Sequence, residues 1–365
     1  MKFKTEKRFI SIALVICMLL SFCFVTNAAG TTANELELAA AEQIERMVSV
    51  FYSDIPGDYE IGNAMTIYNA DVENIYYVIP IFRDGECVGT AEVDSIGNVS
   101  LCDDTTLYAN VSELSLPEYL LYTTGGSVYA ENEETAVELY DSGFDCSENE
   151  VFILLSYMEK SILIEACFET VATDFDISSV VEEIELIDII IGIAPRADIL
   201  PVTTQECSIT NFVEQEPRDP LCWAACVATI VNYRKNRSLT ARNVAQDMGQ
   251  SWPYARVDLD GVEDALSHYG LFYDCVVGKS GWSVIKNEIS SNQAIGVIMS
   301  ATNNGDDHML VGYGYDCGSQ DTDQYSSLRF VHMWDPNGYH RLFQYTDAIY
   351  TINGRQWTWE RTFVD

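Results

Sequence analysis

Basic side chains are scarce in this chain. Its 365 residues include 20 lysines and arginines against 56 aspartates and glutamates, which gives a formal net charge of −36. The phosphates of DNA and RNA repel a chain this acidic, so we expect no nucleic-acid partner.

Metal-binding patterns are also missing. The chain has no Cys-x-x-Cys pair and no His-Glu-x-x-His motif, the spacings that hold zinc. Acidic residues such as Asp71 and Asp94 do not follow a calcium-loop pattern. The Gly-Tyr-Gly at 312–314 lacks the Lys-Ser/Thr that would follow in a phosphate-binding loop. We therefore expect neither a metal nor a cofactor.

One segment that is present suits a thiol nucleophile. Residues 215–233 read Gln-Glu-Pro-Arg-Asp-Pro-Leu-Cys-Trp-Ala-Ala-Cys-Val-Ala-Thr-Ile-Val-Asn-Tyr. Apolar residues recur at helical spacing from Cys222 onward, which places Cys222 in the first turn of a helix. The positive end of the helix dipole there favours the thiolate, which is the attacking species. Gln215 lies on the entering loop, where its amide could donate to an oxyanion.

A nucleophilic thiol needs a base, and the chain has only four histidines: His268, His308, His332 and His340. His308 follows the polar turn Gly-Asp-Asp and opens an apolar run, so it is expected at the mouth of a strand. A later strand ends at Asp335 in Asp-Pro-Asn-Gly, where a carboxylate could orient the imidazole. Trp334 is expected to shield this site from water. We interpret His332, which alternates in register within the same strand, as structural.

The chain resembles the papain-like cysteine peptidases of bacteria in the order of four motifs: Gln, Cys-Trp-Ala-Ala, His followed by Gly-Tyr, and Asp-Pro. The bacteriocin-leader-peptidase-like branch is the most similar and the staphopains are more distant; the resemblance covers about residues 207–350. It implies that Cys222 is the nucleophile, His308 the general base and Asp335 the residue that orients the imidazole. Gln215 would complete the oxyanion hole with the backbone N–H of Cys222, although it precedes the cysteine by seven residues rather than the more familiar six. The family also implies a two-lobed fold, helical on one side and antiparallel sheet on the other, with the site between the lobes.

Each of these residues also has an ordinary interpretation. Cys222 could be a structural or disulfide-bonded cysteine, His308 a surface or capping histidine, and Gln215 a plain loop residue. Asp-Pro-Asn-Gly is also an ordinary turn sequence, and Asn337 is an alternative to Asp335 as the orienting residue.

Residues 1–29 predict a secretory signal peptide. Four basic residues within the first eight precede an apolar run at 9–25, and small residues near Ala28 suit cleavage. No later run suits a membrane span, since residues 184–193 are too short and include acids. We therefore expect a secreted, extracellular protein with no membrane anchor after signal removal, and a retained anchor is the alternative.

Signal removal would leave nine of the eleven cysteines, an odd number that fits one free catalytic thiol beside up to four disulfide bonds. Cys87 and Cys102 fall on adjacent predicted strands, where a cross-strand disulfide is possible. Cys226 should not bridge Cys222, because β-carbons four residues apart on a helix lie about 5–6 Å apart and a disulfide needs about 3.5–4.5 Å. We expect Cys226 to be buried in the helix or paired with Cys207, Cys275 or Cys317.

The exported chain divides into two unlike halves. Residues 30–199 contain 35 acidic and four basic residues, against 20 and 12 in residues 200–365, and all six tryptophans fall in the second half. This step predicts an acidic N-terminal domain and a peptidase domain, joined by a proline-bearing linker at 194–205. Because the acidic domain precedes a secreted peptidase domain, we expect it to be an inhibitory, folding-assisting propeptide that docks on the peptidase domain. A permanent accessory domain is the alternative.

Periodicity predicts an α+β fold in both halves. In the first half we expect a helix at 33–52 and strands at 65–68, 75–82, 88–93 and 99–102. In the second half we expect helices at 222–236, 240–248, 260–269 and 282–291, and strands at 293–300, 309–315, 328–334, 341–345 and 356–362. Helices followed by strands suit a two-lobed α+β thiol peptidase behind a smaller α+β domain.

These features together predict a secreted cysteine endopeptidase precursor. It would hydrolyse peptide bonds of a protein or peptide substrate through a Cys222-His308-Asp335 triad and a thioester acyl-enzyme. Two other functions remain open: a thiol amidase or transglutaminase-like acyltransferase, and an inactive peptidase-like binding protein.

Overall fold

The computed structural model describes residues 33–141 and 202–365, apart from 53–54, 56, 70–73, 96, 115–119, 125–126, 132–135, 217–219, 251–260, 303–305 and 320. The predicted signal peptide, most of the predicted linker, Cys146 and Cys167 lie outside the described residues. None of the described helices combines the length and the apolar character needed to cross a membrane.

The N-terminal half begins with a helix and continues with strands, as its periodicity predicts, and it adds an unpredicted short helix, α3, and strands β1 and β6 to β8. Ile44 and Met47 are fully buried because they lie about one turn apart on the apolar face of the first helix. The elements are α2 (Ala33–Phe51), β1 (Tyr59–Ile61), β2 (Met65–Asn69), β3 (Asn74–Arg83), β4 (Glu86–Val93), β5 (Val99–Cys102), α3 (Thr106–Ser112), β6 (Leu120–Thr124), β7 (Ser127–Glu131) and β8 (Ala136–Asp141).

The C-terminal half has helices first and most of its strands afterwards. Its elements are β9 (Val202–Glu206), α6 (Cys222–Lys235), α7 (Ala241–Asp247), α8 (Gly261–His268), β10 (Asp274–Val277), α9 (Trp282–Ser290), β11 (Ile295–Ala301), β12 (Asp307–Gly318), η1 (Asp323–Leu328), β13 (Phe330–Asp335), β14 (Tyr339–Gln344), β15 (Tyr350–Ile352) and β16 (Arg355–Val364). Helix α6 is the centre of this half. Every residue from Trp223 to Asn232 is buried, and the small side chains of Ala224, Ala225 and Ala228 let the helix lie close to its neighbours.

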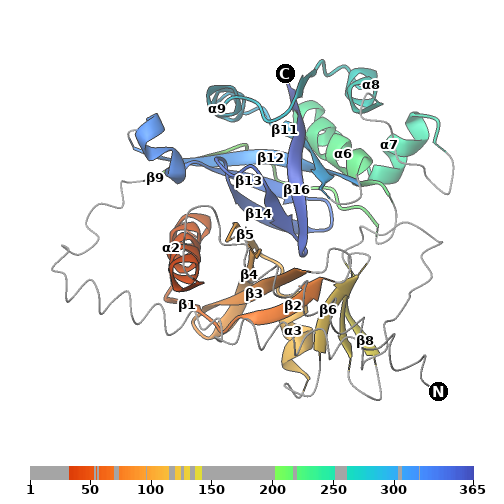
Figure 1. The fold of residues 1–365 in the computed structure, drawn as a ribbon. Helices are drawn as coiled ribbons and strands as arrows, with labels where there is room; N and C mark the ends of the chain where they lie inside the picture. Colours follow the sequence, from red (N-terminus) through yellow and green to blue (C-terminus); the bar gives the residue numbers. More distant parts are fainter. Residues whose placement is uncertain are drawn as a thin grey trace, which may run out of the picture.

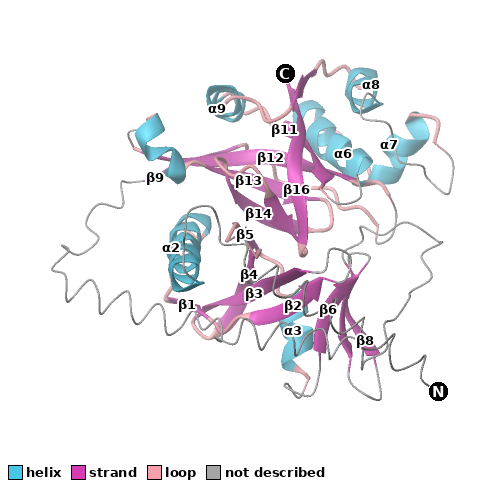
Figure 2. Ribbon diagram, viewed as in Figure 1, coloured by secondary structure: helices cyan, strands magenta, loops and turns pink. Residues whose placement is uncertain are grey.

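The described strands form one large, mostly antiparallel sheet that runs through both halves. Its order is β10-β16-β11-β12-β13-β14-β5-β4-β3-β2-β6-β7-β8, with β1 on β3, β9 on β12 and β15 on β16, and β2 with β6 is a parallel pair. The halves join where β5 pairs with β14. Figure 1 shows the N-terminal half in red to yellow below the C-terminal half in green to blue. Figure 2 shows that α6, α7, α8 and α9 lie on the side of the molecule away from the N-terminal half. The fold is therefore α+β.

Strand β9 differs from the sequence-based expectation. Residues 202–205 belong to the predicted linker at 194–205, yet they pair with β12. The reason lies in β12, which continues to Gly318, beyond the predicted end at residue 315. Strand β11 pairs with β12 only as far as Gly312, so the rest of that edge is available to β9 from Gly314 onward. The β-branched Thr203 and Thr204 favour an extended backbone there.

Two hairpin turns provide a matched test of the contact between the halves. Asp84-Gly85 and Asn353-Gly354 have positive φ at both residues, the geometry of type I′ turns. A β-carbon at Gly85 would meet nothing within 4 Å, whereas one at Gly354 would lie 2.3 Å from the ring of Tyr76 in the N-terminal half.

We expect Gly354→Ala to destabilise the protein more than Gly85→Ala does. The Gly85 variant adds only backbone strain of about 1 kcal/mol, whereas the Gly354 variant adds the same strain and also displaces Tyr76 across the interface. Urea denaturation followed by tryptophan fluorescence gives both free energies of unfolding. Equal losses would contradict the close approach of Gly354 to Tyr76.

Candidate active site

Cys222 is the first residue of α6. The preceding residue, Leu221, makes no side-chain cap to the helix, so the positive end of the helix dipole is not covered by a capping side chain. The side chain of Cys222 is partly exposed, although the helix behind it is buried. The sequence-predicted nucleophile thus combines a helix N-terminus with access from solvent.

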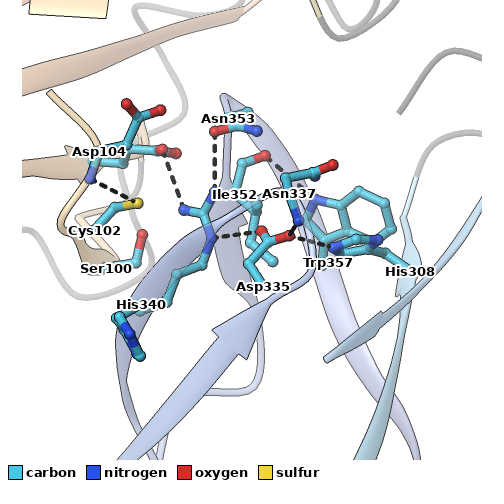
Figure 3. Close-up of polar contacts among 12 residues, drawn as sticks. Ser100, Cys102, Asp104, His308, Asp335, Asn337, His340, Ile352, Asn353 and Trp357 are labelled. Atoms are coloured by element: carbon cyan, nitrogen blue, oxygen red, sulfur yellow. Dashed lines mark hydrogen bonds and ion pairs between the residues drawn. The ribbon is translucent and has the colours of Figure 1, made fainter. Parts of the chain in front are cut away.

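His308 is the second residue of β12 and is 2% exposed. Its imidazole hydrogen-bonds with the side chain of Cys222. Its Nε2 lies 3.0 Å from Oδ1 of Asp335, the last residue of β13, as drawn in Figure 3. Because Nε2 faces the carboxylate, Nδ1 is the ring nitrogen that remains for the thiol. The three residues predicted to form the triad are therefore brought together.

Sheet register explains why His308 and Asp335 meet. Strand β12 pairs with β13 so that Val311 lies opposite Trp334; the same register sets Leu310 opposite Asp335. His308 is two residues from Leu310 and points to the same face of the sheet. It is therefore a diagonal cross-strand neighbour of Asp335, a spacing that long side chains bridge.

Asp335 is fully buried and has a partner on each oxygen. Oδ2 accepts from Nε of Arg341 at 2.8 Å, and Oδ1 accepts from the backbone N–H of Asn337 at 3.0 Å. Arg341 is itself fully buried on β14, opposite Met333, so it is the diagonal neighbour of Asp335 on the other side. Sequence reasoning missed Arg341; its one signal was an arginine directly before the apolar pair Leu342-Phe343 in a predicted strand.

These contacts set the protonation of the site. Burial alone would raise the pKa of the Cys222 thiol, but the hydrogen bond and charge of His308 outweigh it and hold that pKa below its ordinary value. Burial would lower the pKa of His308, whereas Asp335 and Cys222 raise it to about 9. Burial would raise the pKa of Asp335, but the charges of His308 and Arg341 hold it well below its usual range. The arrangement therefore shifts the pair toward a thiolate beside an imidazolium.

Gln215 is 8% exposed and is bound to the turn that follows Asp335. Its backbone N–H donates to the carbonyl of Pro336 at 2.8 Å, and its Nε2 donates to Oδ1 of Asn337 at 2.6 Å. The loop is also fixed to α6, because the N–H of Val213 donates to the hydroxyl of Thr229 at 2.9 Å. Asn337 therefore holds Gln215, while Asp335 rather than Asn337 contacts the imidazole.

The expected shield, Trp334, lies elsewhere. Trp334 neighbours Asp335 in β13, so its side chain points to the opposite face of the sheet, where its ring stacks on Phe212 with centroids 4.8 Å apart. The aromatic residue beside His308 is Trp357 of β16, with ring centroids 6.0 Å apart. It is fully buried and lies beside the imidazole, in the shielding position expected for Trp334.

His332 is separate from this site. It is buried between Asp316, which hydrogen-bonds its Nε2, and Glu206, whose carboxylate lies 3.2 Å from its Nδ1. The charges of these two acids raise the pKa of His332 to about 9 against the effect of burial. Because Glu206 belongs to β9 and Asp316 to β12, the histidine joins these paired strands.

The seven cysteines within the described residues are free thiols. The possible bridge between Cys87 and Cys102 is not formed, because the register sets Cys102 opposite Thr90, three residues further along β4. Cys226 is buried and its thiol donates to the carbonyl of Met309 at 3.2 Å.

No protein-family model matches the chain, and no curated protein matches it. The function of this chain is therefore inferred from the geometry of the site.

We expect Asp335→Asn to slow the alkylation of Cys222 at pH 7. Loss of the carboxylate charge lowers the pKa of His308 and removes the imidazolium that stabilises the thiolate; each unit of pKa changes the thiolate fraction by about tenfold. Iodoacetamide labelling followed by mass spectrometry of the Cys222 peptide measures the rate. The buried Cys226, whose pKa burial raises well above the ordinary value, is the internal control and should stay unmodified. An unchanged Cys222 rate would contradict the assigned coupling.

Proposed function

We propose that this protein is a cysteine endopeptidase that hydrolyses peptide bonds of a protein or peptide substrate. The observation that carries the proposal is the contact between a partly exposed thiol at a helix N-terminus and a buried imidazole that a carboxylate holds. Nucleophile, base and orienting group are the minimal set for acyl transfer through a covalent intermediate.

The roles follow from the protonation of the pair. The Cys222 thiolate attacks the scissile carbonyl carbon and the tetrahedral oxyanion forms. The His308 imidazolium then protonates the leaving amine, which leaves a thioester on Cys222. Neutral His308 next takes a proton from water, whose oxygen attacks the thioester and releases the acid product. Asp335 keeps the ring oriented throughout.

Two groups are assigned to the oxyanion. The backbone N–H of Cys222 lies at the start of α6 without a capping side chain and would donate one hydrogen bond. The side-chain amide of Gln215, which is bound to the turn between β13 and β14, would donate the other. The amide of Gln215 is held by Asn337, so its position is set before substrate arrives.

A papain-like two-lobed architecture fits this proposal. The helices α6 to α9 would form the helical lobe and strands β11 to β16 the sheet lobe, with the site where the start of α6 meets β12 and β13. The predicted secretion and propeptide rest on residues 1–29 and on the composition step near residue 199, and they remain predictions.

We expect Cys222→Ala to abolish both casein digestion and any self-trimming under mild reductant. The change removes the attacking atom, so the loss should reach about a thousandfold or more. The matched control is Cys226→Ala, one helical turn further along α6. In the described residues the Cys226 thiol donates to the backbone carbonyl of Met309, and the variant should retain activity.

Casein digestion by Cys222→Ala at the parent rate would refute the assignment. Transfer of the acyl group to added amines, without new peptide termini, would instead identify an acyltransferase. Absence of both reactions in a parent protein whose Cys222 also alkylates slowly would favour the binding-protein alternative.

The pH dependence of hydrolysis should follow the thiolate–imidazolium pair. The pair exists above the lowered pKa of Cys222 and is lost as pH rises through the pKa of His308, about 9. Turnover of a peptide substrate, measured from pH 5 to 10.5, should therefore rise through the lowered pKa of Cys222 and fall with a midpoint near 9. A decline centred between pH 6 and 7 would contradict the raised pKa of His308.

A further inference from the structure

The N-terminal half meets the C-terminal half directly behind Asp335. Strand β5 pairs with β14 so that Cys102 lies opposite Arg341, the residue whose guanidinium holds Asp335. Asp103 and His340 strengthen the join: the backbone N–H of Asp103 donates to the carbonyl of His340 at 3.1 Å, and the backbone N–H of His340 donates to the Asp103 carboxylate at 2.8 Å. The strand that carries Arg341 is thus fixed on one side by the N-terminal half.

One carboxylate of the N-terminal half reaches Arg341 itself. Glu92 on β4 is 5% exposed, and its Oε1 lies 3.7 Å from Nη1 of Arg341. Its Oε2 accepts from the backbone N–H of Gly354 at 3.3 Å. Figure 3 shows Cys102 and Asp104 of the N-terminal half on one side of this contact and Asp335 and His308 on the other.

Burial makes this contact consequential. Arg341 and Asp335 are both fully buried, so their charges are poorly screened and each depends on its partner. Arg341 lies between Asp335 on β13 and Glu92 on β4, with Asn353 accepting from Nη2 at 3.2 Å. Asp103 also feels the charge of Arg341, but its carboxylate is engaged by the backbone of His340.

We propose that Glu92, which the N-terminal half supplies, is a positioning residue of the active site. This inference rests on the proposed function for its catalytic meaning. The Glu92 carboxylate offsets part of the positive charge of Arg341. Arg341 then neutralises Asp335 less, and Asp335 interacts more strongly with the His308 imidazolium that faces Cys222. Within the part of the chain that the structure describes, contacts between the halves lie at β13, β14, β15 and the start of β16, which include the strands that hold Asp335 and Arg341.

The test is Glu92→Gln in the full chain, with Glu86→Gln as the matched control. Glu86 is the exposed first residue of the same strand, so the control makes the same charge change without touching Arg341. The main readout is the titration of His308 by NMR in histidine-labelled protein, assigned with His308→Ala. The second is kcat and KM for a peptide substrate.

We expect Glu92→Gln to lower the titration midpoint of His308 from about 9 by roughly one pH unit, because Arg341 then neutralises Asp335 more fully. We expect kcat at pH 8.5 to fall several-fold with KM little changed, and Glu86→Gln to match the parent in both. A folded Glu92→Gln protein that titrates like the parent would overturn the proposal.

Folding is checked by circular dichroism. If Glu92→Gln does not fold, Glu92→Asp keeps the charge but withdraws it from Arg341, and an unchanged His308 midpoint in that variant would overturn the proposal equally. The two hypotheses fail separately. A parent protein without hydrolytic activity defeats the endopeptidase assignment while the His308 titration still decides the role of Glu92.

Discussion

A carboxylate with no solvent exposure at the end of a central strand is costly to keep ionised, since desolvation alone disfavours the charge by several kcal/mol. Asp335 remains ionised because each of its oxygens meets a donor, and because positive charges stand on both sides of it. That ionisation raises the pKa of His308, and His308 in turn lowers the pKa of Cys222. The protonation of the Cys222 thiol therefore depends on Asp335, a fully buried carboxylate that acts on it through His308.

The sheet is what places these charges in a row. His308, Asp335 and Arg341 occupy three consecutive strands and are diagonal neighbours on one face, which the registers of β12, β13 and β14 dictate. A shift of one residue in either pairing would turn a member of the set to the opposite face. Helix α6 then needs to supply only one atom, and its buried, small-residue body fixes Cys222 against the mouth of β12. The geometry of the candidate site is therefore mainly a consequence of strand register.

Local signals in the sequence were enough for the parts of the site that local structure decides. The helical period from Cys222, the turn before His308 and the turn after Asp335 all placed these residues at element ends, where the structure has them. Three features depend on pairings across the sheet and could not be read from period or turns. Arg341 has the sequence context of an ordinary strand residue. Trp334 and Trp357 can be distinguished only by the face of the sheet to which each side chain points. Strand β9 forms because β12 extends beyond the end of its pairing with β11. Long-range register decides such features, and it is not encoded in neighbouring residues.

The step in composition near residue 199 is a step in the density of charged residues. The apolar core is not divided at that boundary. Phe330 and Leu342 of the C-terminal half are fully buried in a cluster with Ile44 and Ile79 of the N-terminal half. If the halves separated, this apolar surface would meet water, β14 would become an unpaired edge and Arg341 would lose the carboxylate of Glu92. The N-terminal half therefore completes the sheet that carries Asp335 and shares part of its core, so strand order and core packing cross the boundary that the composition suggests.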